Sequence, residues 1–154
     1  AIEFIYNYAY AKRLHQGDGS FDDAWLRVVN IGGAFENIFE EYGDQILERI
    51  EQYTGYPWEE QAGGYIPVYI IAAKPSFASP MSLAVDDDTA TLLWDCVYQL
   101  AHRNMAVGVK SEELRHQVLE AVTGHVLRSL GMPPESPLDI DLTHQSAKKY
   151  LSKQ

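Results

Sequence analysis

The sequence of 154 residues has a single cysteine, Cys96, so a disulfide within this chain is excluded. A small secreted domain held together by disulfides is therefore excluded as well. Basic residues are also scarce, because 12 Lys and Arg stand against 22 Asp and Glu, which gives a formal net charge of −10. A nucleic-acid surface needs a cluster of basic side chains, and no such cluster is visible. We therefore expect no nucleic-acid partner.

Long hydrophobic runs are absent too, since none reaches the roughly 18 residues that a membrane span requires. The opening segment, residues 1–10, contains Glu3 and lacks the basic start of a signal peptide. We therefore expect no membrane partner and a cytoplasmic location. The chain also lacks a glycine-rich phosphate loop and a CxxC pair, and Cys96 lies in an apolar stretch that predicts a buried, inert thiol.

What remains is the composition of a globular protein, with 46% hydrophobic and 22% charged residues. A chain of this length buries enough surface to fold without covalent links. We expect one domain over residues 1–154, with residues 1–20 as an N-terminal extension and residues 134–154 as a C-terminal tail.

Hydrophobic periodicity predicts helices on both sides of a short β-rich region. Asp22 and Asp23 suit a helix start, and apolar residues recur at spacings of three and four over residues 35–53. Gly32-Gly33 predicts a break before that helix, and Gly55 predicts its end. The β-rich region begins with YIPVYIIAA, residues 65–73, followed by a turn at residues 74–76 and a second strand over residues 81–85.

Two further helices follow the strands. Asp86, Asp87 and Asp88 supply capping side chains for a helix over residues 88–104, and Ser111 opens another helix that ends at Gly131. A short helix is expected around residues 145–151. Because the strands cluster instead of alternating with helices, the order predicts an α+β fold with a small, mostly antiparallel sheet.

The helix over residues 88–104 carries the functional hypothesis. Its core stripe is apolar, and a polar row of Thr91, Asp95, Tyr98 and His102 follows spacings of four, three and four along the other face, with Gln99 beside it. A polar row of this kind is most often a solvated surface. The segment WDCVYQLAHRN nevertheless resembles the metal-binding helix of small zincin metalloproteases of the gluzincin type, in which two histidines spaced i and i+4 bind zinc.

In this resemblance the HExxH signature is degenerate. His102 fills the second histidine position, Tyr98 stands at the first, and Gln99 stands at the position of the catalytic glutamate. A phenol is a poor zinc ligand at neutral pH, and an amide cannot accept a proton from water. The resemblance therefore implies a catalytically inactive domain that serves as a binding or structural module, with Gln99 inactive and no cofactor.

The next helix offers further candidates. Gluzincins take a third zinc ligand from a glutamate on a later helix, and Glu120 is similar in placement. Glu113, His116 and Glu120 share a helical face, whereas His125 lies off that face. The alternative hypothesis is a metal-dependent hydrolase with a rebuilt zinc site using His102, His116 and Glu120, with Asp95 or Glu113 as the base. Ordinary surface roles for each residue remain open.

The resemblance also implies a partner. In such enzymes an edge strand of the sheet pairs with an extended peptide, and Ala78–Val85 is the candidate for that strand. Tyr98, Asp95 and Glu113 are expected to line the neighbouring cleft. An assembly module that uses its aromatic surface is a further reading of the same composition. The sequence carries no signal for oligomeric state.

Overall fold

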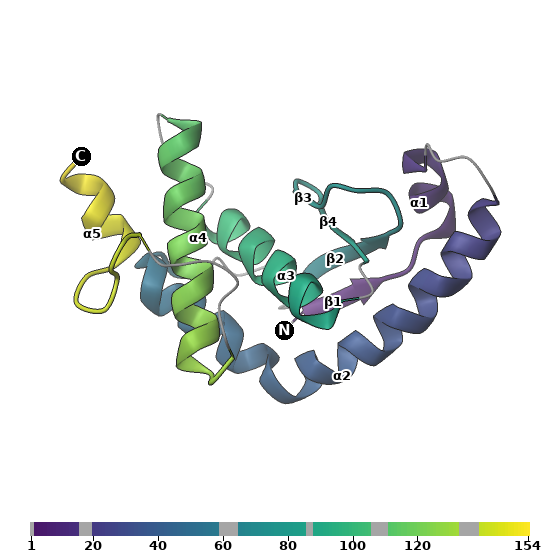
Figure 1. The fold of residues 1–154 in the computed structure, drawn as a ribbon, viewed down its shortest axis with the longest axis horizontal. Helices are drawn as coiled ribbons and strands as arrows, with labels where there is room; N and C mark the ends of the chain where they lie inside the picture. Colours follow the sequence, from purple (N-terminus) through teal and green to yellow (C-terminus); the bar gives the residue numbers. More distant parts are fainter. Residues whose placement is uncertain (1, 16–19, 59–64, 86–87, 106–110, 133–138) are drawn as a thin grey trace.

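The computed structural model describes residues 2–15, 20–58, 65–85, 88–105, 111–132 and 139–154. Its helices and strands confirm the α+β class (Figure 1). They follow one another in the order β1 (Ile2–Ile5), α1 (Tyr8–Leu14), α2 (Phe21–Thr54), β2 (Ile66–Ile71), β3 (Phe77–Ala78), β4 (Met81–Ala84), α3 (Thr89–Asn104), α4 (Glu112–Ser129) and α5 (Ala147–Ser152).

The strands form one sheet in the order β1-β2-β4-β3. Strand β2 is parallel to both β1 and β4, and β3 pairs antiparallel with β4. The prediction of a mostly antiparallel sheet is therefore wrong. Helices α1 and α2 lie between β1 and β2 in the sequence, and such a long connection carries the chain back to the end of the sheet where the next parallel strand starts.

Strand β4 lies inside the sheet, between β2 and β3. The segment Ala78–Val85, expected as an edge strand, is thus divided: Ala78 belongs to β3, and Met81–Ala84 form β4. Ala78 pairs with Met81, so the two strands form a tight hairpin. On this side the edge of the sheet is β3, and the expectation that Met81–Ala84 form an edge is wrong.

The described part of residues 1–20 contributes to the sheet and is no extension outside it. Residues Ile2–Ile5 pair with residues 66–69 of β2. The Phe4 ring packs edge-on against Phe35 and Phe39 of α2, with ring centroids 6.1 and 5.4 Å apart. This segment was missed because four residues give too short a pattern to distinguish a strand from a loop.

Helix α2 is continuous over 34 residues, so the expected break at Gly32-Gly33 is wrong. Packing explains Gly32: a Cβ atom there would lie 2.6 Å from the hydroxyl oxygen of Tyr6. The helix ends as predicted at Gly55, whose φ of 81° is left-handed and whose N–H donates to the Glu51 carbonyl at 2.9 Å.

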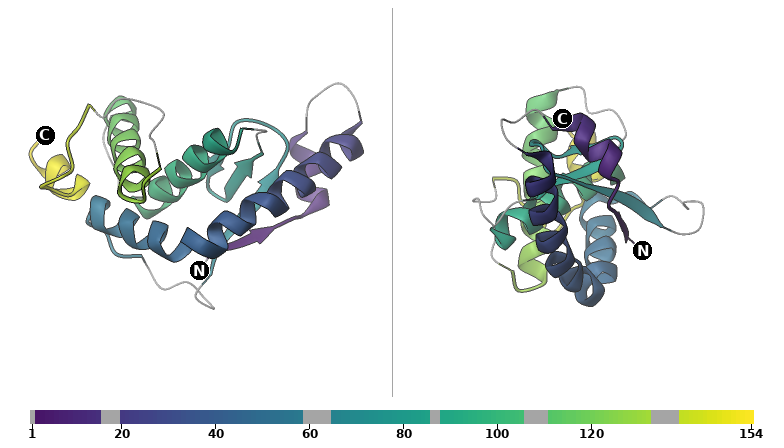
Figure 2. Two further views of the ribbon diagram at one scale, coloured as in Figure 1. Left: turned by 60° about the horizontal axis from the view of Figure 1, so that its bottom comes forward. Right: turned by 90° about the vertical axis from the view of Figure 1, so that its right-hand side faces the viewer.

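The core lies between the sheet and helices α2, α3 and α4, and α2 runs along one side of the molecule (Figures 1 and 2). Alternate residues of β2 face this core, as the period of a strand requires. Helix α1 packs against another part of the sheet, where the Tyr10 ring lies 5.0 Å from the Tyr69 ring and its hydroxyl lies 2.8 Å from Ser82 Oγ. The strand and helix residues of the main core include Ile66, Val68, Ile70, Leu83, Phe35, Phe39, Ile46, Ile50, Leu92, Val97, Leu100, Val118 and Val122.

The described part of residues 134–154 also belongs to the core. Ile140, Leu142 and Ala147 are buried, and the Leu142 N–H donates to Nε2 of His125 at 3.1 Å. The expectation of a tail is therefore corrected for residues 139–154, and the short helix predicted there is α5. No described helix is long and apolar enough to cross a membrane.

Helices α3 and α4 begin and end close to the predicted residues. The Asp88 side chain accepts from the Ala90 N–H, and the Ser111 hydroxyl accepts from the Leu114 N–H. Asp86 and Asp87, also expected as caps, lie outside the described residues. The two helices pack against each other, which brings their polar faces to one surface of the molecule.

Candidate cleft beside helix α3

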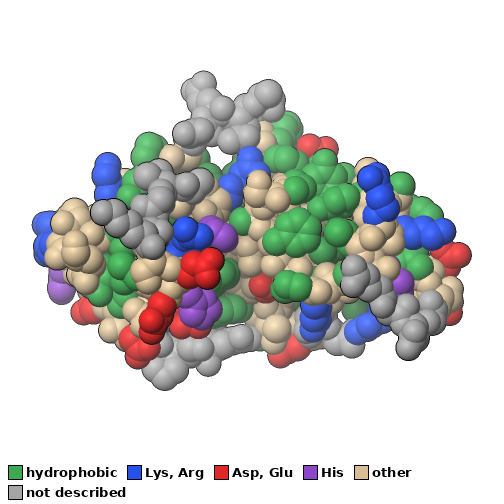
Figure 3. Space-filling view, turned by 90° about the horizontal axis from the view of Figure 1, so that it is seen from above, with side chains coloured by type: hydrophobic (Ala, Val, Ile, Leu, Met, Phe, Trp, Pro, Cys, Tyr) green, Lys and Arg blue, Asp and Glu red, His purple; other side chains and the backbone are tan. Residues whose placement is uncertain are grey.

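A cavity of about 380 Å³ lies between α3, the start of α4 and the loop that follows β2. We call it the α3 cleft, and it is lined by Lys74, Pro75, Ser76, Ala84, Thr91, Leu92, Trp94, Asp95, Tyr98, Gln99 and His116. On the face that Figure 3 shows, histidine, acidic and basic side chains gather over α4, and hydrophobic side chains lie beside them. The lining of the cleft combines polar side chains, such as Asp95 and His116, with apolar ones, such as Trp94 and Leu92.

The α3 cleft brings together four of the predicted site residues. Asp95, Tyr98 and Gln99 reach it from α3, and His116 reaches it from α4. Glu113 does not line the cavity: it is exposed in the first turn of α4. His102 and Glu120 do not line the cavity either, although Glu120 contacts His116.

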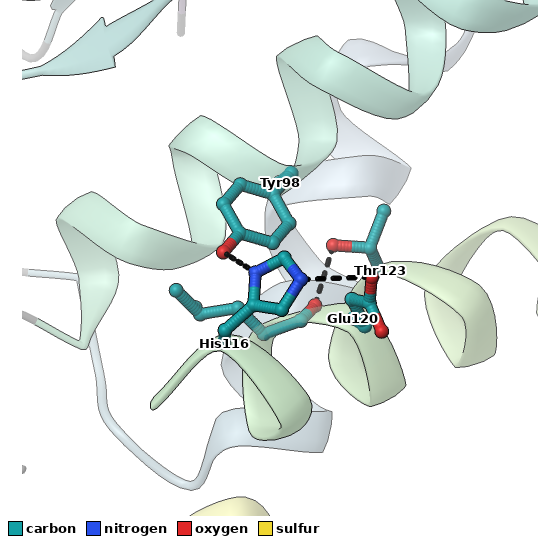
Figure 4. A network of polar contacts seen from close by, with 5 residues as sticks. Tyr98, His116, Glu120 and Thr123 are labelled. Carbon is teal, nitrogen blue, oxygen red and sulfur yellow. Dashed lines mark hydrogen bonds and ion pairs between the residues drawn. The ribbon is translucent and has the colours of Figure 1, made fainter. Parts of the chain in front are cut away.

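Tyr98, His116 and Glu120 form a line of polar contacts across α3 and α4 (Figure 4). The Tyr98 hydroxyl lies 2.7 Å from His116 Nδ1, and His116 Nε2 lies 3.0 Å from a carboxylate oxygen of Glu120. A neutral His116 with its proton on Nε2 satisfies both contacts, because Nδ1 then accepts from the phenol and Nε2 donates to the carboxylate. The side chains of His116 and Glu120 are 61% and 34% exposed, so water screens their contact.

The environment of Tyr98 and His102 fixes their protonation. Burial raises the pKa of the Tyr98 phenol, and the nearby Glu120 carboxylate raises it further, so the phenol is protonated at neutral pH. Burial lowers the pKa of His102, and the positive charge of Arg115 lowers it further. His102 is therefore neutral at neutral pH, but a cation already lies close to it.

Gln99 is more buried than its predicted place beside the polar row suggests. Its side chain is 8% exposed, and its Nε2 donates to the Ser76 carbonyl at 3.5 Å. The Oε1 atom is buried with no hydrogen-bond partner among the described residues. The amide thus lies against the cleft wall and has no basic atom with which to activate water.

Among the cleft residues that the sequence did not indicate, Ser76 makes polar contacts with a predicted site residue. Its hydroxyl donates to Asp95 Oδ2 and accepts the Ala84 N–H at 2.8 Å, so it links the loop after β2 to α3 and β4. The sequence signal at Lys74-Pro75-Ser76 is that of a turn, and nothing in its spacing indicates Asp95 as a partner. Asp95 is therefore engaged by a hydroxyl in this structure.

The residues of the α3 cleft do not fit the catalytic zinc site that the resemblance implies. Tyr98 is a protonated phenol, Gln99 is an amide, and Arg115 places a positive charge near His102. Within the described part of the chain, no group of three or more His, Cys, Asp or Glu side chains is arranged to hold a metal ion. The alternative ligand set of His102, His116 and Glu120 stays a prediction.

Cys96 faces away from this chemistry. Its side chain is fully buried, as predicted, and burial raises the pKa of the thiol, with a smaller contribution from Asp95. A protonated thiol without access to solvent is a poor nucleophile.

Comparison of the chain with protein-family models, curated proteins and solved structures finds no match.

Proposed function

We propose that the chain is a catalytically inactive domain of the zincin type, in which the α3 cleft binds an extended segment of a peptide or protein. The observation that carries this proposal is the line of contacts from Tyr98 through His116 to Glu120. The resemblance puts a zinc ligand at the position of Tyr98 and further candidate ligands at His116 and Glu120. In this chain these three side chains contact one another instead.

The order of elements supports the zincin part of the proposal. After β1 and α1, the long helix α2 is followed by the other three strands of the sheet, of which the short antiparallel β3 lies at one edge, and then by two helices packed together. From α2 onward, the sequence of helix, small sheet and two helices is similar to that of a minimal gluzincin. Tyr98 and His102 are one helical turn apart on α3, and the electrostatic influence of Glu120 reaches Tyr98 from α4.

The chemistry of the same residues supports the absence of catalysis. A hydrolase of this type needs a general base that takes a proton from water, and Gln99 has no basic atom. Asp95, one of two alternative bases, accepts a hydrogen bond from Ser76. Glu113, the other one, lies outside the cavity lining.

The lining of the cleft supports a binding role. Trp94, Pro75 and Tyr98 offer flat apolar surface, while Lys74, Asp95 and His116 offer polar atoms around it. Strand β3 forms the neighbouring edge of the sheet, with Phe77 and Ala78 available to an added strand. The proposed ligand is thus a short extended peptide that contacts β3 and the aromatic wall.

The competing function is a metal-dependent hydrolase that uses His102, His116 and Glu120. The neutral state of His102 favours it, since a neutral imidazole is the form that binds metal. The two functions differ in one measurable property, which is stoichiometric zinc binding.

Zinc content and zinc titration test the proposal. Protein treated with a chelator and then supplied with zinc is expected to retain well below one zinc per chain after dialysis, and the His102→Ala variant is expected to behave in the same way. Tight one-to-one binding that His102→Ala removes would contradict the proposal and favour the hydrolase. Cleavage of a peptide library, measured by mass spectrometry, is expected to be absent in both zinc-supplied and zinc-free protein.

A cytoplasmic location belongs to the same proposal. It is supported by the single cysteine, which is buried and protonated. Fractionation of cells that express the chain at its natural level tests it, and recovery in a secreted or membrane fraction contradicts it.

A further inference from the structure

A second groove lies on another part of the molecule, between strand β1 and helix α2, and has a volume of about 440 Å³. We call it the β1 groove. The two elements lie beside each other in both Figure 1 and Figure 2. None of its lining residues belongs to the α3 cleft; they are Ile2, Glu3, Phe4, Gly33, Glu36, Asn37, Phe39, Glu40, Gly43 and Asp44.

Strand β1 is the edge of the sheet opposite to β3. It pairs with β2, and among the described residues no strand pairs with its other side. In a parallel pair, alternate residues direct their N–H and C=O groups away from the partner strand, so β1 presents along this edge donors and acceptors that no described strand pairs with. These groups are a template for one more strand, and the groove lies beside them.

The helix wall of the groove is open. Gly33, Asn37, Glu40 and Asp44 follow one stripe of α2, which extends over roughly 16 Å, the length of about five residues of an extended peptide. A Cβ atom on Gly33 would meet nothing within 4 Å, whereas one on Gly32 would collide with Tyr6. Packing within the chain therefore explains Gly32 but not Gly33, and the space at Gly33 is part of the groove.

The charge of the groove selects the chemistry of its occupant. Its lining residues include four acidic ones, Glu3, Glu36, Glu40 and Asp44, and no basic one. Glu36 also accepts a hydrogen bond from the Tyr6 hydroxyl at 3.1 Å, which fixes that carboxylate. A cationic ligand reduces the repulsion between carboxylates that surround one groove. The strand edge beside the groove is suited to hydrogen bonds with the backbone of an extended peptide.

We infer that the β1 groove binds an extended segment of a partner protein that contains Lys or Arg at alternate positions, added to the sheet beside β1. The backbone of the segment pairs with β1, and its basic side chains reach the carboxylates of α2. This function is independent of the α3 cleft and adds a second binding surface to the one proposed there.

A fluorescent eight-residue peptide of alternating Lys and Val tests the inference by polarisation. We expect saturable binding that weakens about tenfold for Glu40→Lys and similarly for Gly33→Leu, which fills the open space. The matched control is Glu48→Lys, an exposed position on α2 outside the groove that carries the same charge change. Circular dichroism spectra and melting temperatures of all variants establish that each one is folded.

Two further peptides separate strand addition from simple charge attraction. A peptide of alternating Glu and Val is expected not to bind, and a Lys-Val peptide with alternate backbone nitrogens methylated is expected to lose most of its affinity. Chemical shift changes in the amides of Ile2–Ile5 are expected with the unmodified peptide. The inference is overturned by equal weakening in Glu48→Lys and Glu40→Lys, by undiminished binding of the methylated peptide, or by no saturable binding up to about 1 mM.

Discussion

Two histidines on helix α4, His116 and His125, occupy opposite environments. The His116 side chain is 61% exposed at the α3 cleft and contacts Tyr98 and Glu120. His125 is 6% exposed, its Nε2 accepts the Leu142 N–H at 3.1 Å, and its ring stacks on Tyr53 with centroids 5.3 Å apart. One histidine faces a cavity with polar neighbours, and the other fixes the chain segment that leads to α5.

Helix α4 thus carries one histidine that stabilises the fold and another that is available to a ligand. A buried imidazole that satisfies a buried backbone N–H contributes to the fold, because its loss leaves that donor without a partner. An exposed imidazole whose contacts are screened by water contributes little to the fold and is free to contact a ligand. Substitutions in the α3 cleft are therefore expected to lower the stability of the fold less than substitutions in the buried part of α4 around His125.

The largest effect is expected for His125→Ala. It removes the acceptor for the Leu142 N–H and the stacking partner of Tyr53, and we expect it to lower the free energy of unfolding by about 2–4 kcal/mol. The matched change His116→Ala is expected to lower it by less than about 1 kcal/mol. Urea denaturation followed by circular dichroism measures both values. An equal decrease in the free energy of unfolding for the two variants would contradict the different roles of the two histidines.

A smaller effect is expected for Tyr98→Phe, which removes the hydroxyl that His116 Nδ1 contacts. Stability is expected to change by about 1 kcal/mol or less. The ring resonances of His116 are expected to shift in the NMR spectrum, while those of His125 stay in place. A shift at His125, or none at His116, would show that the Tyr98–His116 contact is not formed in solution.

The smallest effect is expected from a third histidine, His102 on α3. Its pKa is lowered in the folded state by burial and by Arg115, so below the ordinary histidine pKa the unfolded state binds the proton more readily. Its contribution to stability is present above about pH 6.5 and is lost as the pH falls below that value. Melting temperatures of wild type and His102→Gln across pH 5–8 measure it. A wild-type curve parallel to that of the variant would contradict the lowered pKa.

Local sequence signals predicted helices α3 and α4 because their caps and apolar periods act within one or two turns. Asp88 and Ser111 cap the helices that they were expected to cap. The direction of the strands depends on contacts distant in sequence, such as Ile2 with Ile66, and no local pattern encodes it. The Gly32-Gly33 pair indicated a break because local propensity does not reveal the Tyr6 hydroxyl that packs against Gly32.

The sequence could indicate those residues of the candidate site that share a face of one helix, because helical spacing alone sets that arrangement. Asp95 and Tyr98, which the spacing on α3 put on one face, both line the cleft, and His116 joins them from α4. The contribution of Ser76 was missed because it comes from a loop after β2 that the fold brings against α3. Glu113 lies in the first turn of α4 and does not line the cavity, because the helix start is displaced from the cleft.

Zinc titration of wild type beside the double variant Tyr98→His/Gln99→Glu tests the central claim most directly. These two changes restore the missing ligand and base of the zincin signature, with His102 and Glu120 already in the sequence. We predict that the double variant binds one zinc per chain, that adding His102→Ala abolishes this binding, and that wild type does not bind zinc stoichiometrically. A folded double variant without zinc affinity would contradict the zincin-type scaffold, and one-to-one zinc binding by wild type would contradict its inactivity.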